Sequence, residues 1–239
     1  MAIKTRAIEY QHEGTTLEGV IAFDDEQSGE RPAVMISHAW AGRDDIDVDF
    51  AKRLARLGYS GFALDLYGKG VRGKSVEENQ KLMTPFMKDR SFLQARLLHA
   101  LDVVKTQPEA DAENIVVMGF CFGGLCALDL ARTGVDIKGA ASFHGIFAPP
   151  GNTDNNEIKA KVIAYHGWDD PMVKPDDVVA FAREMTEMKA DWQLLAFGNT
   201  MHAFTNPHAN DPGFGTVYNK AAADRSWTSL TAFLKECFA

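Results

Sequence analysis

The fold of this chain is decided by one stretch, residues 114–132, with the sequence NIVVMGFCFGGLCALDLAR. Its apolar first part predicts a buried strand, and its second part, beginning near Gly123, predicts a helix. Cys121 lies at the turn between the two, with glycines two positions before and after it. A residue in such a turn has a strained backbone and an exposed side chain, and the glycines let neighbouring chain approach. The spacing therefore predicts that Cys121 is a nucleophile.

The helix after Cys121 would point its amino end at the sulfur, and that arrangement favours thiolate over thiol. The alternative is that Cys121 is a small buried residue, as many cysteines are. The other cysteines, Cys126 and Cys237, match no spacing typical of a metal site or redox pair. We therefore expect Cys121 to be the thiol that reacts first with an alkylating reagent.

Short apolar runs and amphipathic segments alternate along the rest of the chain. The predicted strands are 33–37, 61–67, 114–120, 139–143, 161–167 and 192–197. Five helices are predicted. The first carries Phe50, Leu54 and Leu57 on one face and stops at Gly58. The others run from Leu93 to Val104, from near Gly123 onward, over residues 176–185, and from Trp227 to Leu234. This alternation requires parallel strand pairing with helices on both faces of the sheet.

The first residues follow a different pattern. Residues 3–11 and 16–23 alternate polar and apolar side chains and are separated by His12-Glu13-Gly14, which predicts an antiparallel hairpin. The sequence therefore predicts an α/β fold with a mostly parallel, doubly wound sheet and an antiparallel N-terminal hairpin. Because composition marks no boundary, we expect one domain over residues 1–239.

Residues 68–90 fit this scheme least well. Glycines and charged residues replace a regular period, and Pro85 interrupts any helix, so we expect a loop with short helical pieces. It would lie over the carboxyl edge of the sheet, where open α/β sheets bind ligands. The segment is either a wall of a substrate pocket or a solvated insertion, and the sequence favours neither.

Composition excludes several classes of protein. The 239 residues carry 25 Lys and Arg against 33 Asp and Glu, a net charge of −8, which argues against nucleic-acid and anionic-membrane partners. The N-terminus lacks the apolar run of a signal peptide, so we expect a cytoplasmic protein with reduced thiols. No sequence motif for a metal or a nucleotide cofactor is present, so we expect neither. No oligomeric state is predicted.

A cysteine nucleophile needs a base and an acid that orients it, and in this fold they follow in the order nucleophile, acid, histidine. His166-Gly-Trp-Asp-Asp-Pro-Met-Val173 follows one predicted strand, and its H-G-x-x-D-x-x-V pattern selects Asp170 as the acid, with Asp169 as the alternative. Either aspartate could instead cap a helix. His202, after the strand 192–197, is the predicted base, since no other histidine at the active edge follows the acid.

The remaining histidines and the loop 38–42 complete the candidate site. His12 and His99 are interpreted as structural, and His208 as solvated. Backbone N–H groups of Phe122 and Trp40 are the expected donors to an oxyanion. Side chains expected to line the pocket are His38, Ala39, Phe143, His144, Phe204 and Asn206.

Four segments carry a resemblance to a known family: GFCFGG at 119–124, HGWDDPMV at 166–173, MHAF at 201–204 and LDLYGKG at 64–70. With them the chain resembles the dienelactone hydrolase family of α/β hydrolases, from about residue 32 to residue 233. The resemblance implies the α/β-hydrolase fold and a Cys121, Asp170 and His202 triad. It also implies hydrolysis of a small ester or lactone through a thioacyl intermediate.

The chain differs from that family at three places. The family's Glu beside the nucleophile matches Ala39, its carboxylate-binding Arg matches Asn206, and its paired tyrosines match Phe143-His144. We therefore expect small neutral esters or lactones to be preferred over anionic dienelactone. A thioesterase or acyltransferase with the same triad is the nearest alternative, and a non-catalytic small-molecule binding protein is the alternative of a different class.

Overall fold

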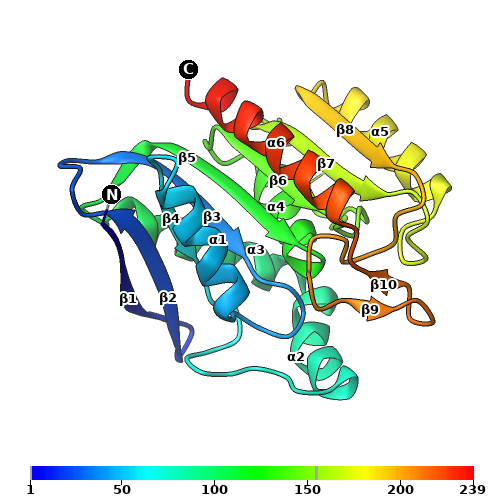
Figure 1. Ribbon diagram of the computed structural model, residues 1–239, viewed down its shortest axis with the longest axis horizontal. Coiled ribbons are helices and arrows are strands. Elements are labelled where there is room, and N and C mark those ends of the chain that lie inside the picture. Colours follow the sequence, from blue (N-terminus) through cyan, green and yellow to red (C-terminus); the bar gives the residue numbers. More distant parts are fainter. Residues whose placement is uncertain (1, 154–155) are drawn as a thin grey trace. The chain divides into compact units, whose positions relative to one another are not determined.

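The computed structural model describes residues 2–153 and 156–239, which fall into two compact units on either side of the Met118–Gly119 bond (Figure 1). Strand β5 (Ala110–Phe120) crosses that point. Each unit has its own strand order and its own covering helices. The expectation of a single domain over residues 1–239 stays a prediction.

The first unit has the sheet order β1-β2-β4-β3-β5. Its elements are β1 (Ile3–His12), β2 (Thr15–Asp24), β3 (Arg31–Ser37), α1 (Asp45–Ala55), β4 (Ser60–Ala63), α2 (Val76–Lys88), α3 (Arg90–Lys105) and β5. β1 and β2 form an antiparallel hairpin, and β3 pairs with β4 in parallel. Glu13 and Gly14 both have positive φ, 46° and 75°, the conformation that matches a two-residue hairpin turn to the twist of its strands. The predicted N-terminal hairpin is therefore confirmed.

Two boundaries in this unit were predicted wrongly. Helix α1 ends at Ala55, so Leu57 lies beyond it and is 47% exposed, while Gly58, at φ 92°, ends the turn as expected. The strand predicted over 61–67 ends at Ala63. The carboxylate of Asp65 accepts hydrogen bonds from the N–H groups of the residues two and three positions later, at 2.9 and 3.1 Å, and this local turn replaces the strand.

The prediction of a mere loop with short helical pieces over 68–90 was also wrong, because α2 is a continuous helix that contains Pro85. Ser75 caps its start by accepting a hydrogen bond from the N–H of Glu78 at 3.2 Å, and the carboxylate of Glu78 accepts from the N–H of Lys74 at 2.7 Å. Proline lacks one N–H, but its carbonyl still accepts from the N–H of Asp89 at 3.0 Å. The helix therefore continues past the residue expected to interrupt it.

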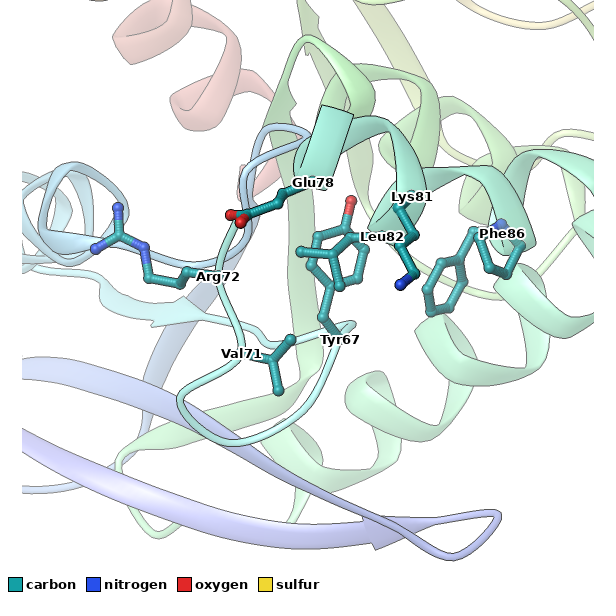
Figure 2. Close-up of a pocket in the computed structure, with 8 residues that line it drawn as sticks. Tyr67, Val71, Arg72, Glu78, Lys81, Leu82 and Phe86 are labelled. Carbon is teal, nitrogen blue, oxygen red and sulfur yellow. The ribbon is translucent and has the colours of Figure 1, made fainter. Parts of the chain in front are cut away.

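Helix α2 and the loop before it line an open pocket of about 410 Å³ within the first unit (Figure 2). Its lining residues are Tyr67, Val71, Arg72, Glu78, Lys81, Leu82, Pro85 and Phe86. The rings of Tyr67 and Phe86 lie 5.6 Å apart, and the Tyr67 hydroxyl donates to the carbonyl of Trp40 at 3.0 Å. Residues of segment 68–90 thus line a pocket in the first unit, and a role of this segment in binding substrate stays a prediction.

In the second unit, β6, β7 and β8 are neighbours in the sheet and run parallel. Its elements are α4 (Phe122–Arg132), β6 (Gly139–Phe143), β7 (Lys161–Gly167), α5 (Pro175–Glu187), β8 (Trp192–Phe197), β9 (Asn210–Asp211), β10 (Thr216–Val217) and α6 (Lys220–Cys237). Helix α6 crosses in front of β6 and β7 in Figure 1. The strands predicted at 139–143, 161–167 and 192–197 are confirmed to the residue, whereas β9 and β10 were not predicted.

Parallel pairing brings the carboxyl ends of β6, β7 and β8 to one edge. Phe143 is in register with Tyr165, and Gly167 is in register with Phe197. The loops that follow these strands therefore begin side by side. The predicted class, a mostly parallel α/β sheet with an antiparallel start, is confirmed. Among the described residues, no helix is both long and apolar enough to span a membrane.

Candidate active site

Cys121 is the one residue between β5 and α4, and its backbone is strained. Its φ is 58° and its ψ is −116°, in a region that residues with a side chain rarely adopt. Hydrogen bonds on both sides hold it there. Its N–H donates to the carbonyl of Phe143 at 3.0 Å, and its own carbonyl accepts from the N–H groups of Gly124 and Leu125 at 3.0 and 3.3 Å. The strained turn expected from the sequence is present.

The glycines around Cys121 are required by close backbone contacts. A Cβ atom on Gly119 would collide with the carbonyl of Gly123. A Cβ atom on Gly124 would lie 2.7 Å from the hydroxyl of Ser142 and 2.8 Å from the Cα of Gly145. Since the obstacles include backbone atoms, they cannot move aside cheaply. The G-x-C-x-G-G spacing thus reflects the packing of the turn onto its own helix and onto β6.

Asp170 and His202 form a buried hydrogen-bonded pair. One carboxylate oxygen of Asp170 lies 2.7 Å from Nδ1 of His202, and the other accepts from the N–H of Met172 at 2.8 Å. The two residues are 4% and 1% exposed. The neighbouring Asp169 is exposed, and its N–H donates to the carbonyl of Thr200 at 2.9 Å. Of the two aspartates that the sequence left open, Asp170 is the one that contacts the histidine.

Two backbone hydrogen bonds hold the loop that carries His202. The N–H of His202 donates to the carbonyl of Gly215 at 3.0 Å, and its carbonyl accepts from the N–H of Val217 at 3.1 Å. Val217 belongs to β10, which pairs with β9. These strands are two residues long, too short to leave a periodic pattern, so sequence analysis missed the support that they give to His202.

Cys121 and Asp170 act together on the charge of His202. Burial lowers the pKa of His202, but the negative charge on Cys121 and hydrogen bonds with Asp170 and Cys121 outweigh it and raise the pKa to about 10. Because Nδ1 is bonded to Asp170, the nitrogen left for the thiol is Nε2, which is buried and has no hydrogen-bond partner within residues 2–153 and 156–239. This arrangement favours the protonated form of His202.

Several of the expected pocket residues lie near His202. The ring of His144 is 5.0 Å from that of His202 and 5.1 Å from that of Phe204, measured between centroids. Phe143 is buried at the end of β6. Asn206 is half-buried in the same loop, and its side-chain oxygen accepts from the N–H of His208 at 2.9 Å. Sequence analysis found these positions but not the contact between the two histidines.

Three expected site residues, His38, Ala39 and Trp40, belong to the first unit. His38 is buried, its Nδ1 donates to the carbonyl of Ala39 at 2.7 Å, and its Nε2 accepts from the N–H of Leu66 at 3.2 Å. Both nitrogens of that ring are therefore occupied within the first unit. The expected roles of His38, Ala39 and Trp40 stay predictions, as does that of the N–H of Phe122, the first residue of α4.

The described part of the chain, 2–153 and 156–239, contains no group of three His, Cys, Asp or Glu side chains arranged to hold a metal ion. The chemistry that the arrangement itself supports is nucleophilic. A thiol in a strained turn, a buried histidine and a buried carboxylate are the three groups used for acyl transfer through a covalent intermediate.

Comparisons with known proteins give a consistent result. The sequence model of the dienelactone hydrolase family matches residues 17–238. The solved structure named m3DLH is 34% identical, with a TM-score of 0.94 and 100% of each chain covered. A dienelactone hydrolase-like promiscuous phosphotriesterase from metagenomic libraries is 33% identical, with a TM-score of 0.93 and 99% of each chain covered. A putative carboxymethylenebutenolidase of Aquifex aeolicus is 27% identical over 235 residues, which cover 95% of this chain and 96% of the relative.

Proposed function

Since the chain belongs to the dienelactone hydrolase family and is a hydrolase with the α/β-hydrolase fold, we propose that Cys121 is its nucleophile and that small neutral esters or lactones are its substrates. One observation carries the proposal. The imidazole of His202 is bonded to Asp170 through one nitrogen and interacts with Cys121, which raises its pKa. That is the charge state needed for a ready thiolate.

In the first half of the reaction, the thiolate of Cys121 attacks the carbonyl carbon of the ester and forms a tetrahedral oxyanion. The N–H of Phe122, at the amino end of α4, and the N–H of Trp40 are the proposed donors to that oxyanion. The intermediate collapses when the C–O bond to the alcohol breaks. The imidazolium of His202 gives its proton to the departing alkoxide, and a thioacyl enzyme remains.

In the second half, neutral His202 takes a proton from water, and the resulting hydroxide attacks the thioester. The C–S bond breaks, the acid leaves, and the thiolate again faces an imidazolium. Asp170 keeps Nδ1 of His202 protonated throughout, so that Nε2 is the nitrogen that moves the proton.

The preference for neutral substrates rests on Asn206 and on the charge of the chain. An amide side chain cannot offer the paired charged donors with which an arginine holds a carboxylate, and the net charge of −8 disfavours anions further.

The test is a trapping experiment with a neutral aryl acetate. The wild-type protein should release the aryl alcohol in a burst, and acid quenching followed by peptide mapping should find one acetyl group on Cys121. Cys121→Ala should abolish both, whereas Cys126→Ala should abolish neither. Turnover by the Cys121→Ala variant, or acetyl on another residue, would overturn the nucleophile assignment.

Substrate charge and acyl acceptor are tested on the same preparation. We expect kcat/KM for the neutral aryl acetate to exceed that for dienelactone, and a clear preference for dienelactone would show that another cation takes the place of the arginine. A kcat/KM for coenzyme A thioesters above that for the aryl acetate would favour the thioesterase alternative. Transfer to an added alcohol in place of water would favour an acyltransferase, and labelling of Cys121 without turnover would favour a binding protein.

A second candidate activity is hydrolysis of phosphotriesters, because a relative described as a promiscuous phosphotriesterase is 33% identical over 99% of this chain. A phosphotriester is neutral and would suit a site without the arginine. The thiolate would displace the aryloxide at phosphorus, and water would then cleave the P–S bond. Loss of aryl phosphotriester turnover in Cys121→Ala would support this side activity, and unchanged turnover would exclude it from the same site.

We also propose that both units act as one domain in the cytoplasm. The family match over residues 17–238 runs across both units, which supports a single domain.

A further inference from the structure

His144 is a buried histidine to which the proposed reaction gives no task, and its backbone is strained. It follows the last residue of β6, and its φ is 39° although it is not a glycine. Its N–H donates to the carbonyl of Tyr165 at 2.8 Å. The residue just before it, Phe143, accepts the hydrogen bond from the N–H of Cys121. His144 is thus fixed to the same strand end that holds the turn of Cys121.

The side chain of His144 reaches the loop that carries His202. Its Nε2 lies 2.8 Å from the hydroxyl of Thr205, and its ring meets the rings of His202 and Phe204 edge to face. One imidazole therefore contacts three of the four residues from 202 to 205. Because it is 3% exposed, these contacts are shielded from water.

The surroundings of His144 favour the neutral form of its ring. Burial and the neighbouring charge of His202 together place the pKa of His144 well below its ordinary value. A neutral ring can lie beside an imidazolium, whereas a second positive charge at a centroid distance of 5.0 Å would be repelled. His144 can therefore pack against His202 without electrostatic repulsion of the imidazolium.

We propose that His144 is a positioning residue for His202: through its bond to Thr205 it ties the loop 202–205 to the end of β6, and so fixes the distance between His202 and Cys121. The inference rests on the proposed function, since His202 must be the base. It predicts that the bond between His144 and Thr205 matters for the rate of turnover more than for substrate affinity.

Thr205 offers a matched pair of variants. Thr205→Val removes the hydroxyl and keeps the shape, and Thr205→Ser keeps the hydroxyl. We expect Thr205→Val to lower kcat about tenfold, the effect of one hydrogen bond, with KM within about twofold, and Thr205→Ser to stay near the wild type. His144→Phe should lower kcat similarly, and His144→Phe combined with Thr205→Val should cost little more than either alone, because both remove one bond.

A readout other than turnover separates positioning from a structural role. The rate of Cys121 alkylation by iodoacetamide, followed from about pH 5 to about pH 9, reports the thiolate that His202 stabilises. Its inflection should move to higher pH in Thr205→Val and His144→Phe and should stay in place in Thr205→Ser. His208→Phe, an exposed histidine in the same loop, is the control for the replacement of a histidine by phenylalanine.

Equal kcat values for Thr205→Val and Thr205→Ser, or an unmoved inflection together with a lowered melting temperature, would overturn the positioning role. Cys121→Ala, assayed beside them, keeps the two proposals apart. If Cys121→Ala retains turnover, the proposed nucleophile is wrong. If Cys121→Ala is inactive while Thr205→Val matches the wild type, only the role of His144 is wrong.

Discussion

The connection from β5 to α4 and the connection from β4 to α2 both lead from a strand to a helix, but they were not equally predictable. The turn from β5 to α4 is the single residue Cys121, whereas the path from β4 to α2 takes residues 64–75. In the short turn, positive φ and the contact of Gly119 with the backbone of Gly123 leave the chain one path. In the long one, side chains such as Asp65 and the cap residue Ser75 select the path. A path that is fixed by steric contacts between neighbouring residues can be predicted from the sequence. A path that depends on hydrogen bonds from separate side chains cannot.

The largest expected effect tests the chemistry that depends on the short turn. Asp170→Asn should lower kcat by about 10³ to 10⁴, since loss of the orienting carboxylate leaves His202 in the wrong tautomer. Asp169→Asn should leave kcat within about twofold, because that carboxylate is exposed and Asp170 alone is bonded to His202. Steady-state kinetics with a neutral aryl acetate measures both.

Both variants should keep near-native far-ultraviolet circular dichroism, which serves as the folding control. Similar losses in the two variants would mean that the loop after β7 presents its carboxylates differently. In that case the sequence of a short loop after a strand would identify catalytic residues no better than the sequence of the long connection from β4 to α2.

The next effect compares a glycine of the short turn with one of the long connection. Gly119→Ala should lower the free energy of unfolding by about 3 kcal/mol or more, because its Cβ meets the backbone of Gly123. Gly70→Ala should cost only about 1 kcal/mol, since its φ is 74° but nothing lies within 4 Å of the added Cβ. Urea unfolding gives both values, and equal costs would remove the distinction between the connections.

A third effect concerns pH and the charge pair beside the turn. His202 has a folded-state pKa of about 10, above its ordinary value of 6.5, so the folded protein binds this proton more tightly than the unfolded chain. The stabilisation is complete below about pH 6.5 and is lost as the pH rises through about 10. The melting temperature of the wild type should therefore fall more between about pH 8 and about pH 10.5 than that of His202→Gln. Parallel curves for the two proteins would contradict the raised pKa.

Much of the second unit was predictable because its signals are local. The strands 139–143, 161–167 and 192–197 were found to the residue, since each is a short, mostly apolar run between turn residues. Gly167 in the H-G-x-x-D pattern has a packing reason as well, because its Cβ would lie 2.5 Å from the carbonyl of Thr200. The H-G-x-x-D pattern, from which Asp170 was predicted, is therefore also required by the close packing of the loop after β7 against the loop after β8.

Contacts between segments that are far apart in the chain could not be predicted from the sequence. Thr205 carried no signal, yet its hydroxyl lies 2.8 Å from the ring of His144, 61 residues earlier in the chain. The strands β9 and β10 support His202 with two residues each, below the length at which alternation can be recognised. In the first unit, proline chemistry argued against a helix at 76–88, yet Pro85 lies inside α2, whose start is capped by Ser75.

The smallest expected effect tests whether a single residue, Pro85, determines the path of the chain from β4 into α2. Pro85→Ala should stabilise the protein by about 1 kcal/mol or less, because the gain of an N–H in mid-helix is partly offset by the greater freedom of the unfolded chain. Urea unfolding of the wild type and the variant measures this change. A clear destabilisation would mean that Pro85 itself sets the path of α2, and the long connection would then be as locally determined as the turn at Cys121.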